Sequence, residues 1–164
     1  MITATTEGLL TYLADLIETV ERYGATVLPP NDADEVHWGS SGNDLVLDLG
    51  TRLPSPHRVR PAELVLQERW VPGGRGRWEL AEYGYELRDP ALNYRRALHR
   101  HDVDRFVGAF DVVTHEHCEA TMGVEICGHY AGEPVSGAID GFFRLYGIWL
   151  TYSRPDCSEL RCLD

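Results

Sequence analysis

The chain contains no lysine. All 15 of its basic residues are arginine, against 26 acidic residues, which gives a net charge of −11. An arginine guanidinium is a planar fork of donors suited to bidentate contacts with carboxylate or phosphate groups. The overall negative charge argues against a broad nucleic-acid surface, because neutralisation of phosphates dominates that kind of binding. A local site for an anion is still open, since residues 88–105 carry a net charge of +2 and the rest of the chain carries −13.

Long apolar runs and paired cysteine motifs are also missing. The first residues lack the basic and apolar stretches of a signal peptide, and the longest apolar segment, 139–150, is interrupted by Asp140 and Arg144. These absences predict a cytoplasmic protein without a membrane segment. None of the four cysteines forms a C-x-x-C pair, which excludes a zinc ribbon and a thioredoxin-type motif and favours free thiols.

Hydrophobic periodicity predicts a single α+β domain over residues 1–152, followed by a tail at 153–164 that is expected to be mobile. Leu9, Leu13, Leu16 and Val20 recur at helical spacing and predict a helix over 5–23, and a second helix is expected over 135–150. Strands are expected at 44–49, 64–71, 77–87, 92–101 and 111–118, with loops at 28–43 and 123–134. The predicted architecture is an antiparallel β-meander of four to five strands with an N-terminal and a C-terminal helix.

The histidines are unevenly distributed. Five of the seven fall between residues 99 and 129, and four of these form two H-x-H pairs, His99/His101 and His115/His117. Side chains at positions i and i+2 of a strand share one face of the sheet. Each pair therefore presents two imidazoles on one face, and adjacent strands would bring all four together.

A hairpin centred on Gly108 predicts the register of these two strands. It sets His99 opposite His117 and His101 opposite His115, and it sets Arg100 opposite Glu116 on the other face, a favourable charge pair. If the preceding strand pairs through the turn at Asp89-Pro90, three further residues join the histidine face: Tyr83, Tyr85 and Arg95.

Imidazole groups near neutral pH suit acid–base catalysis. Cleavage of RNA through its 2′-hydroxyl needs a base for that proton, an acid for the leaving oxygen and a cation for the phosphorane. Two histidines, an arginine and a tyrosine supply these roles. The candidate catalytic residues are His99, His101, His115, His117 and Tyr85, and the candidate phosphate contacts are Arg95 and Arg96, one on each face of a regular strand.

Two other interpretations remain open at this point. The first is a site for zinc or another transition metal, because H-x-H on a strand presents two ligands and further candidates lie nearby. Its ligands would be drawn from His115, His117, Cys118, Cys127 and His129, although the spacing matches no standard zinc signature. The second is a non-catalytic, acidic binding or assembly protein whose histidines are structural and whose partner is basic.

Several segments together resemble the TumE-like toxins of bacterial toxin–antitoxin modules. The resemblance covers roughly residues 78–150 and is carried by Tyr83-Gly-Tyr85-Glu-Leu, Asn93-Tyr94-Arg95-Arg96-Ala-Leu-His99-Arg-His101-Asp102, His115-Glu-His117 and Glu133-Pro134 before a closing helix. It implies an α+β toxin acting on RNA, with a cognate antitoxin as partner. The expected function is therefore toxin-like, metal-independent RNA cleavage without a cofactor, and the sequence leaves the oligomeric state open.

Overall fold

The computed structural model describes residues 2–25, 36–54, 61–101, 114–119, 127–131 and 134–151. Within these ranges the chain forms an α+β fold, as predicted, with antiparallel strands and a helix near each end. The expected tail at 153–164 lies outside the described residues. The elements are β1 (Thr3–Thr5), α1 (Thr6–Arg22), β2 (Val36–Ser41), β3 (Asp44–Leu53), β4 (Ala62–Pro72), β5 (Arg77–Asp89), β6 (Tyr94–Arg100), β7 (Thr114–Glu119), β8 (Cys127–Ala131) and α3 (Ala138–Leu150).

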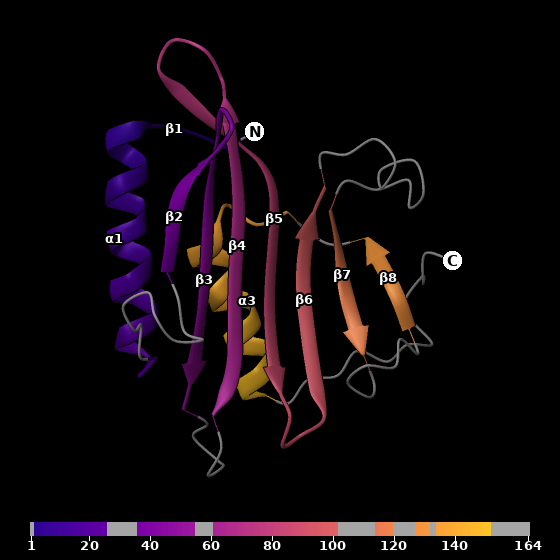
Figure 1. The fold of residues 1–164 in the computed structure, drawn as a ribbon. Coiled ribbons are helices and arrows are strands. Elements are labelled where there is room, and N and C mark those ends of the chain that lie inside the picture. The colour runs from indigo at the N-terminus through magenta and orange to yellow at the C-terminus, as the bar shows by residue number, and fades with distance from the viewer. Residues whose placement is uncertain are drawn as a thin grey trace.

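One sheet contains all the described strands (Figure 1). Its order is β2-β3-β4-β5-β6-β7-β8, with the short β1 paired to β5, so it has eight strands and not the four to five expected. Both segments predicted as loops, 28–43 and 123–134, contribute a strand, β2 and β8. The β2–β3 hairpin closes through Gly42 and Asn43, and Gly42 has a φ of 65°, a conformation that favours glycine in a two-residue turn.

One face of the sheet is covered by both helices and carries the core. Alternation along β4 buries Ala62, Leu64 and Leu66 on that face and leaves Glu63 and Gln67 exposed on the other. Thr5 caps α1 by accepting a hydrogen bond from the Gly8 N–H at 3.0 Å, and Leu9, Leu16 and Val20 are buried as the periodicity predicted. The opposite face of the sheet is left without a helix among the described residues (Figure 1).

Close packing fixes α3 against the sheet. Gly141 lies directly on Tyr85, and a Cβ added to it would come within 2.2 Å of the ring. Glycine is unfavourable within a helix, but the packing of α3 on Tyr85 requires it at Gly141. At the start of α3 the Gly137 N-cap offers no side chain, and the Glu68 carboxylate from β4 accepts the Ala138 N–H at 2.9 Å instead.

Glu68 is the centre of a buried polar network that joins four elements. Its carboxylate also accepts hydrogen bonds from the Tyr12 hydroxyl at 2.6 Å, the Tyr85 hydroxyl at 2.7 Å and the Trp70 indole N–H at 2.9 Å. Burial raises the pKa of Glu68, and it also raises the pKa of Tyr12 and Tyr85, which keeps both phenols protonated as donors. No helix in the described part of the chain is long and apolar enough to cross a membrane.

Candidate acid–base groove

The open face of the sheet carries a groove of about 700 Å³. It runs from the β2–β3 hairpin, across β4 and β5, to the end of β6. The residues around it are Ser40, Ser41, Val46, Leu47, Asp48, Gln67, Glu68, Arg69, Glu82, Tyr83, Gly84, His99, Arg100 and His101. The first histidine pair thus lies in the groove, as a site for chemistry on this face requires.

His99 and His101 lie close together at one end of the groove. Their ring centroids are 5.8 Å apart with an angle of 74° between the planes, and both side chains are partly exposed. The His99 ring lies over Gly84 of β5, where a Cβ would be 3.7 Å from Nε2. The absence of a side chain at Gly84 therefore keeps the floor of the groove clear beside the imidazole.

Charges in the groove are largely compensated. Arg69 donates to Glu82 at 2.9 Å and to Asp44 at 3.0 Å, and these hydrogen bonds raise the pKa of its guanidinium although burial opposes them. Asp48 and Gln67 are exposed on the same face and add polar groups to the floor. The groove thus offers two imidazoles among polar side chains and no large excess of either charge.

The register between β6 and β7 differs from the prediction by two residues. His99 lies opposite His115, His117 lies opposite Ala97, and Arg100 lies opposite Thr114. The error arose from the assumption of a hairpin centred on Gly108. A shift of two preserves the faces, so His99, His115 and His117 still share one face of the sheet.

β8 extends the histidine face by one more strand. His129, which was expected in a loop, lies opposite His117, and His115 lies opposite Ala131. The backbone register therefore brings histidines from three neighbouring strands to the open face: His99 of β6, His115 and His117 of β7, and His129 of β8.

Tyr83 and Tyr85 are on the opposite face, which corrects the prediction that they join the histidines. Their partners in β6 are Arg100 and Leu98, whereas His99 lies opposite Gly84. Tyr85 is fully buried, and its hydroxyl is engaged by Glu68. Among the candidate catalytic residues it is the one that the fold places in the core, away from the groove.

The two arginines predicted to contact phosphate lie on opposite faces, as expected, but neither lines the groove. Arg95 forms an ion pair with Glu86 on the open face. Burial alone would raise the pKa of Glu86, but the ion pairs with Arg88 and Arg95 outweigh burial, so the pKa is lowered. Arg96 is buried beneath α3. Arg100 borders the groove at the end of β6, but it lies opposite Tyr83, so its position belongs to the helix-covered face and not to the face of His99.

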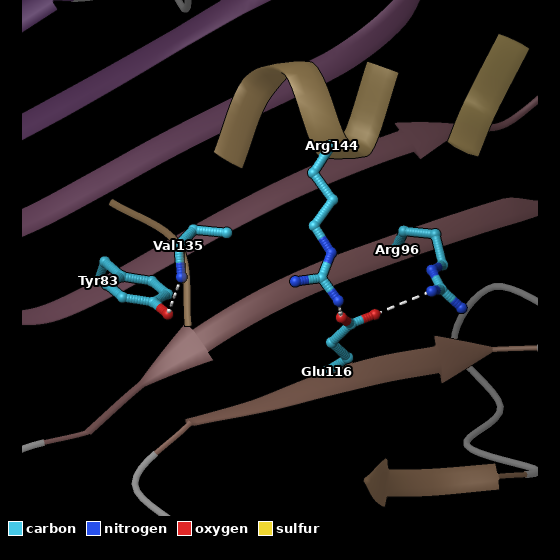
Figure 2. Close-up of polar contacts among 5 residues, drawn as sticks. All are labelled: Tyr83, Arg96, Glu116, Val135 and Arg144. Atoms are coloured by element: carbon cyan, nitrogen blue, oxygen red, sulfur yellow. Dashed lines mark hydrogen bonds and ion pairs between the residues drawn. The ribbon is translucent and has the colours of Figure 1, made fainter. Parts of the chain in front are cut away.

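Glu116 forms ion pairs with two arginines on the helix-covered face (Figure 2). It accepts from Arg96 at 2.9 Å, and it forms an ion pair with Arg144, which reaches down from α3. Tyr83 lies nearby, where its hydroxyl accepts the Val135 N–H at 3.4 Å. Burial and the charge of Arg96 lower the pKa of Arg144. Glu116 is thus turned away from the histidines, as a regular β7 predicts.

No protein-family model matches the chain, and neither the curated proteins nor the solved structures compared with it gave a match. The resemblance to the TumE-like toxins is therefore an expectation from the motifs alone. Among the side chains that the structure describes, no three histidine, cysteine or acidic groups converge as for a metal ion.

Several groove residues had no signal in the sequence. No motif in the sequence marks Gln67, Asp48 or Gly84. They line the same groove as His99 because β3, β4, β5 and β6 are adjacent in the sheet. The hairpin that supplies Ser40 and Ser41 could have been found, because Gly-Asn between two short runs is a turn signal.

Proposed function

We propose that the groove is an acid–base hydrolytic site that cleaves the phosphodiester backbone of RNA. The observation that carries the proposal is the partly exposed pair His99 and His101, 5.8 Å apart at the end of an open groove. Imidazole changes its protonation state near neutral pH, so one ring can accept a proton while its neighbour donates one. Two rings at this separation are close enough to reach oxygens of a single phosphate group.

The reaction assigns a role to each histidine. One imidazole removes the proton from a ribose 2′-hydroxyl, whose oxygen attacks the phosphorus and forms a 2′,3′-cyclic phosphate. The bond from phosphorus to the 5′-oxygen breaks, and the other imidazolium donates a proton to that leaving oxygen. The step consumes no cofactor and needs no metal.

The RNA substrate is supported by the chemistry of the histidine pair. The groove histidines fall in the segment 88–105, whose net charge is +2 in a chain of net charge −11, while the charges that line the groove itself are largely balanced. This favours local contact with one phosphate over extended binding along an anionic backbone. The motif resemblance points to the same class, a toxin-like protein whose partner would be a cognate antitoxin.

The direct test is cleavage of an RNA oligonucleotide by the purified, untagged chain. We expect products that end in a 2′,3′-cyclic phosphate, and we expect His99→Ala and His101→Ala each to lower the rate at least about a hundredfold, as for loss of a general acid or base. The matched control is Arg22→Ala on α1, whose side chain is 69% exposed in an i,i+4 ion pair. Equal rates in all four proteins would contradict the proposal.

Expression in bacteria provides a second readout. The wild-type chain should arrest growth, whereas soluble His101→Ala expressed at the same level should not. Tight binding of RNA without any cleavage would instead identify a binding module and overturn the catalytic role of the histidines.

A further inference from the structure

A row of open-face residues crosses the groove from strand to strand. Asp48 of β3 lies opposite Gln67 of β4. Gln67 lies in turn opposite Gly84 of β5, and Gly84 lies opposite His99 of β6. Because neighbouring strands are about 4.8 Å apart, the backbones of Gln67 and Asp48 lie about 10 Å and about 14 Å from that of His99. The row therefore leads from the histidine pair to polar side chains on the far side of the groove.

Gly84 leaves an open space in this row. A Cβ at Gly84 would be 3.7 Å from His99 Nε2 and 4.0 Å from Gln67 Oε1, so the imidazole and the amide border this space from the β6 side and the β4 side. A ribose seated over Gly84 places its 2′-hydroxyl beside His99 and its base over β4 and β3.

Asp48 and Gln67 are the polar side chains that such a base would meet. Both are exposed and line the groove, and within the described ranges neither forms a hydrogen bond or an ion pair. Arg69 and Glu82, which line the groove beside them, pair with each other at 2.9 Å. Directly opposed residues of an antiparallel pair have their Cβ atoms about 4.5–5.5 Å apart. The carboxylate and the amide are therefore close enough to bind one planar group together.

Their combined hydrogen-bonding pattern is complementary to the Watson–Crick edge of guanine. That edge presents two adjacent donors, the N1–H and the N2 amino group, followed by the O6 acceptor. A carboxylate supplies two acceptor oxygens and an amide supplies an N–H donor, so Asp48 matches N1 and N2 and Gln67 matches O6. Adenine, cytosine and uracil do not present two adjacent donors on this edge, and a carboxylate repels the acceptor that takes the place of one.

We infer that the groove selects guanosine on the 5′ side of the cleaved bond, with Asp48 and Gln67 as the residues that read the base. This inference rests on the proposed RNA cleavage and gives it a substrate class, single-stranded RNA in which a guanosine carries the attacking 2′-hydroxyl. The strand is single because only an unpaired base exposes its Watson–Crick edge. Cleavage then leaves a guanosine 2′,3′-cyclic phosphate and frees the 5′-oxygen of the next nucleotide.

The test uses DNA strands that contain one ribonucleotide, so that a 2′-hydroxyl can attack at a single bond. We expect kcat/KM for guanosine to exceed that for adenosine, cytidine or uridine by about 5- to 150-fold, the range for one bidentate contact with a base. Inosine, which lacks the N2 amino group, should lose part of this advantage. The ratio between bases is the readout, because the shared acid–base step cancels in it.

Two variants test the residues that read the base. Asp48→Asn replaces one acceptor by a donor, and Gln67→Glu places a carboxylate against O6, so each should abolish the preference for guanosine. The matched control is Asp15→Asn at an exposed position of α1, which should keep the preference of the wild type. Equal rates for all four bases in the wild type, or a preference that survives in both groove variants, would overturn the inference and leave RNA cleavage standing.

Strands made wholly of deoxynucleotides separate this inference from the proposed cleavage. They carry no 2′-hydroxyl, and the wild type should bind a thymidine strand with one deoxyguanosine more tightly than the same strand with one deoxyadenosine. Asp48→Asn should bind both strands equally. If no ribonucleotide strand is cleaved, the proposed cleavage fails, and this difference in affinity still decides whether the groove reads guanine. Equal affinity of the wild type for both strands would overturn the inference.

Discussion

Gly84 illustrates how one missing side chain shapes the groove. Its backbone is not in the left-handed region, and the nearest atoms to an added Cβ would be the His99 ring at 3.6–3.7 Å and Gln67 at 4.0 Å, which are ordinary contact distances. We expect Gly84→Ala to leave the fold intact and to raise the free energy of unfolding by about 0.5–1 kcal/mol, because glycine in a strand loses more conformational entropy than alanine.

The same substitution should slow RNA cleavage, since the methyl group occupies the floor beside the imidazole. Denaturant unfolding and a cleavage assay on one preparation check both effects. A variant that is more stable and fully active would show that substrate does not approach this part of the floor.

Glu68 gives the fold a pH dependence that can be worked out from its surroundings. Burial raises its pKa above the ordinary value of 4.5, although four hydrogen bonds oppose the shift. The folded state therefore binds the proton more tightly than the unfolded state. The resulting stabilisation is fully present below pH 4.5 and is lost as the pH rises through the folded-state pKa.

We therefore expect the stability of Glu68→Gln relative to the wild type to increase as the pH is raised from about 4.5 towards neutrality. Urea unfolding of both proteins across this range measures it. A difference that does not change with pH would show that Glu68 keeps an ordinary pKa in the folded state.

The face of the sheet on which Tyr85 lies could not be predicted from the sequence. Alternation correctly predicted that Tyr83 and Tyr85 share a face, but not which face of the neighbouring strand they join. Asp89 pairs with Tyr94 across the turn, so odd positions in β5 lie opposite even positions in β6. One residue more or less in that turn would have placed Tyr85 beside the histidines, and turn length is the least predictable part of a hairpin.

At the scale of elements, α3 is anchored by buried polar groups as well as by apolar packing. Glu116 binds Arg96 of the neighbouring strand β6 and Arg144 of α3 (Figure 2), and its side chain is 2% exposed. Glu116→Ala leaves the buried Arg96 without this carboxylate, and we expect it to lower the free energy of unfolding by about 3–5 kcal/mol.

Arg144→Ala is the matched comparison. Its side chain is 29% exposed, and the Arg96–Glu116 pair survives its loss, so we expect a cost below about 1 kcal/mol. Urea unfolding of the two variants compares them. Similar costs would mean that the burial of the Arg96–Glu116 pair contributes little.

The elements that could be predicted are those with an internal signal. The helix periodicity of Leu9, Leu16 and Val20 and the alternation in β4 and β5 belong to the segments themselves. β2 and β8 were missed because they are short edge strands whose residues, such as Gly39 and Gly128, form strands through pairing with β3 and β7. The residues within each strand do not distinguish it from a loop, and for β2 the available signal is the Gly42-Asn43 turn that follows it.

At the scale of the molecule, the order of the strands creates the groove. Ser40 and Ser41 precede His99 by 59 and 58 residues in the sequence, and the path β2-β3-β4-β5-β6 brings them to opposite sides of one groove. The sequence indicated an α+β fold and a face of histidines. It could not indicate the neighbours of those histidines, because they depend on long-range pairing.

The pH–rate profile of RNA cleavage tests the central claim most directly. The profile is measured in EDTA, which removes any contribution from a bound metal, for the wild type, His99→Ala and His101→Ala. We expect a bell-shaped profile for the wild type, and a profile that has lost one limb, with a much lower maximum, for each variant. An unchanged bell at an unchanged rate in both variants would show that His99 and His101 are not the acid and the base.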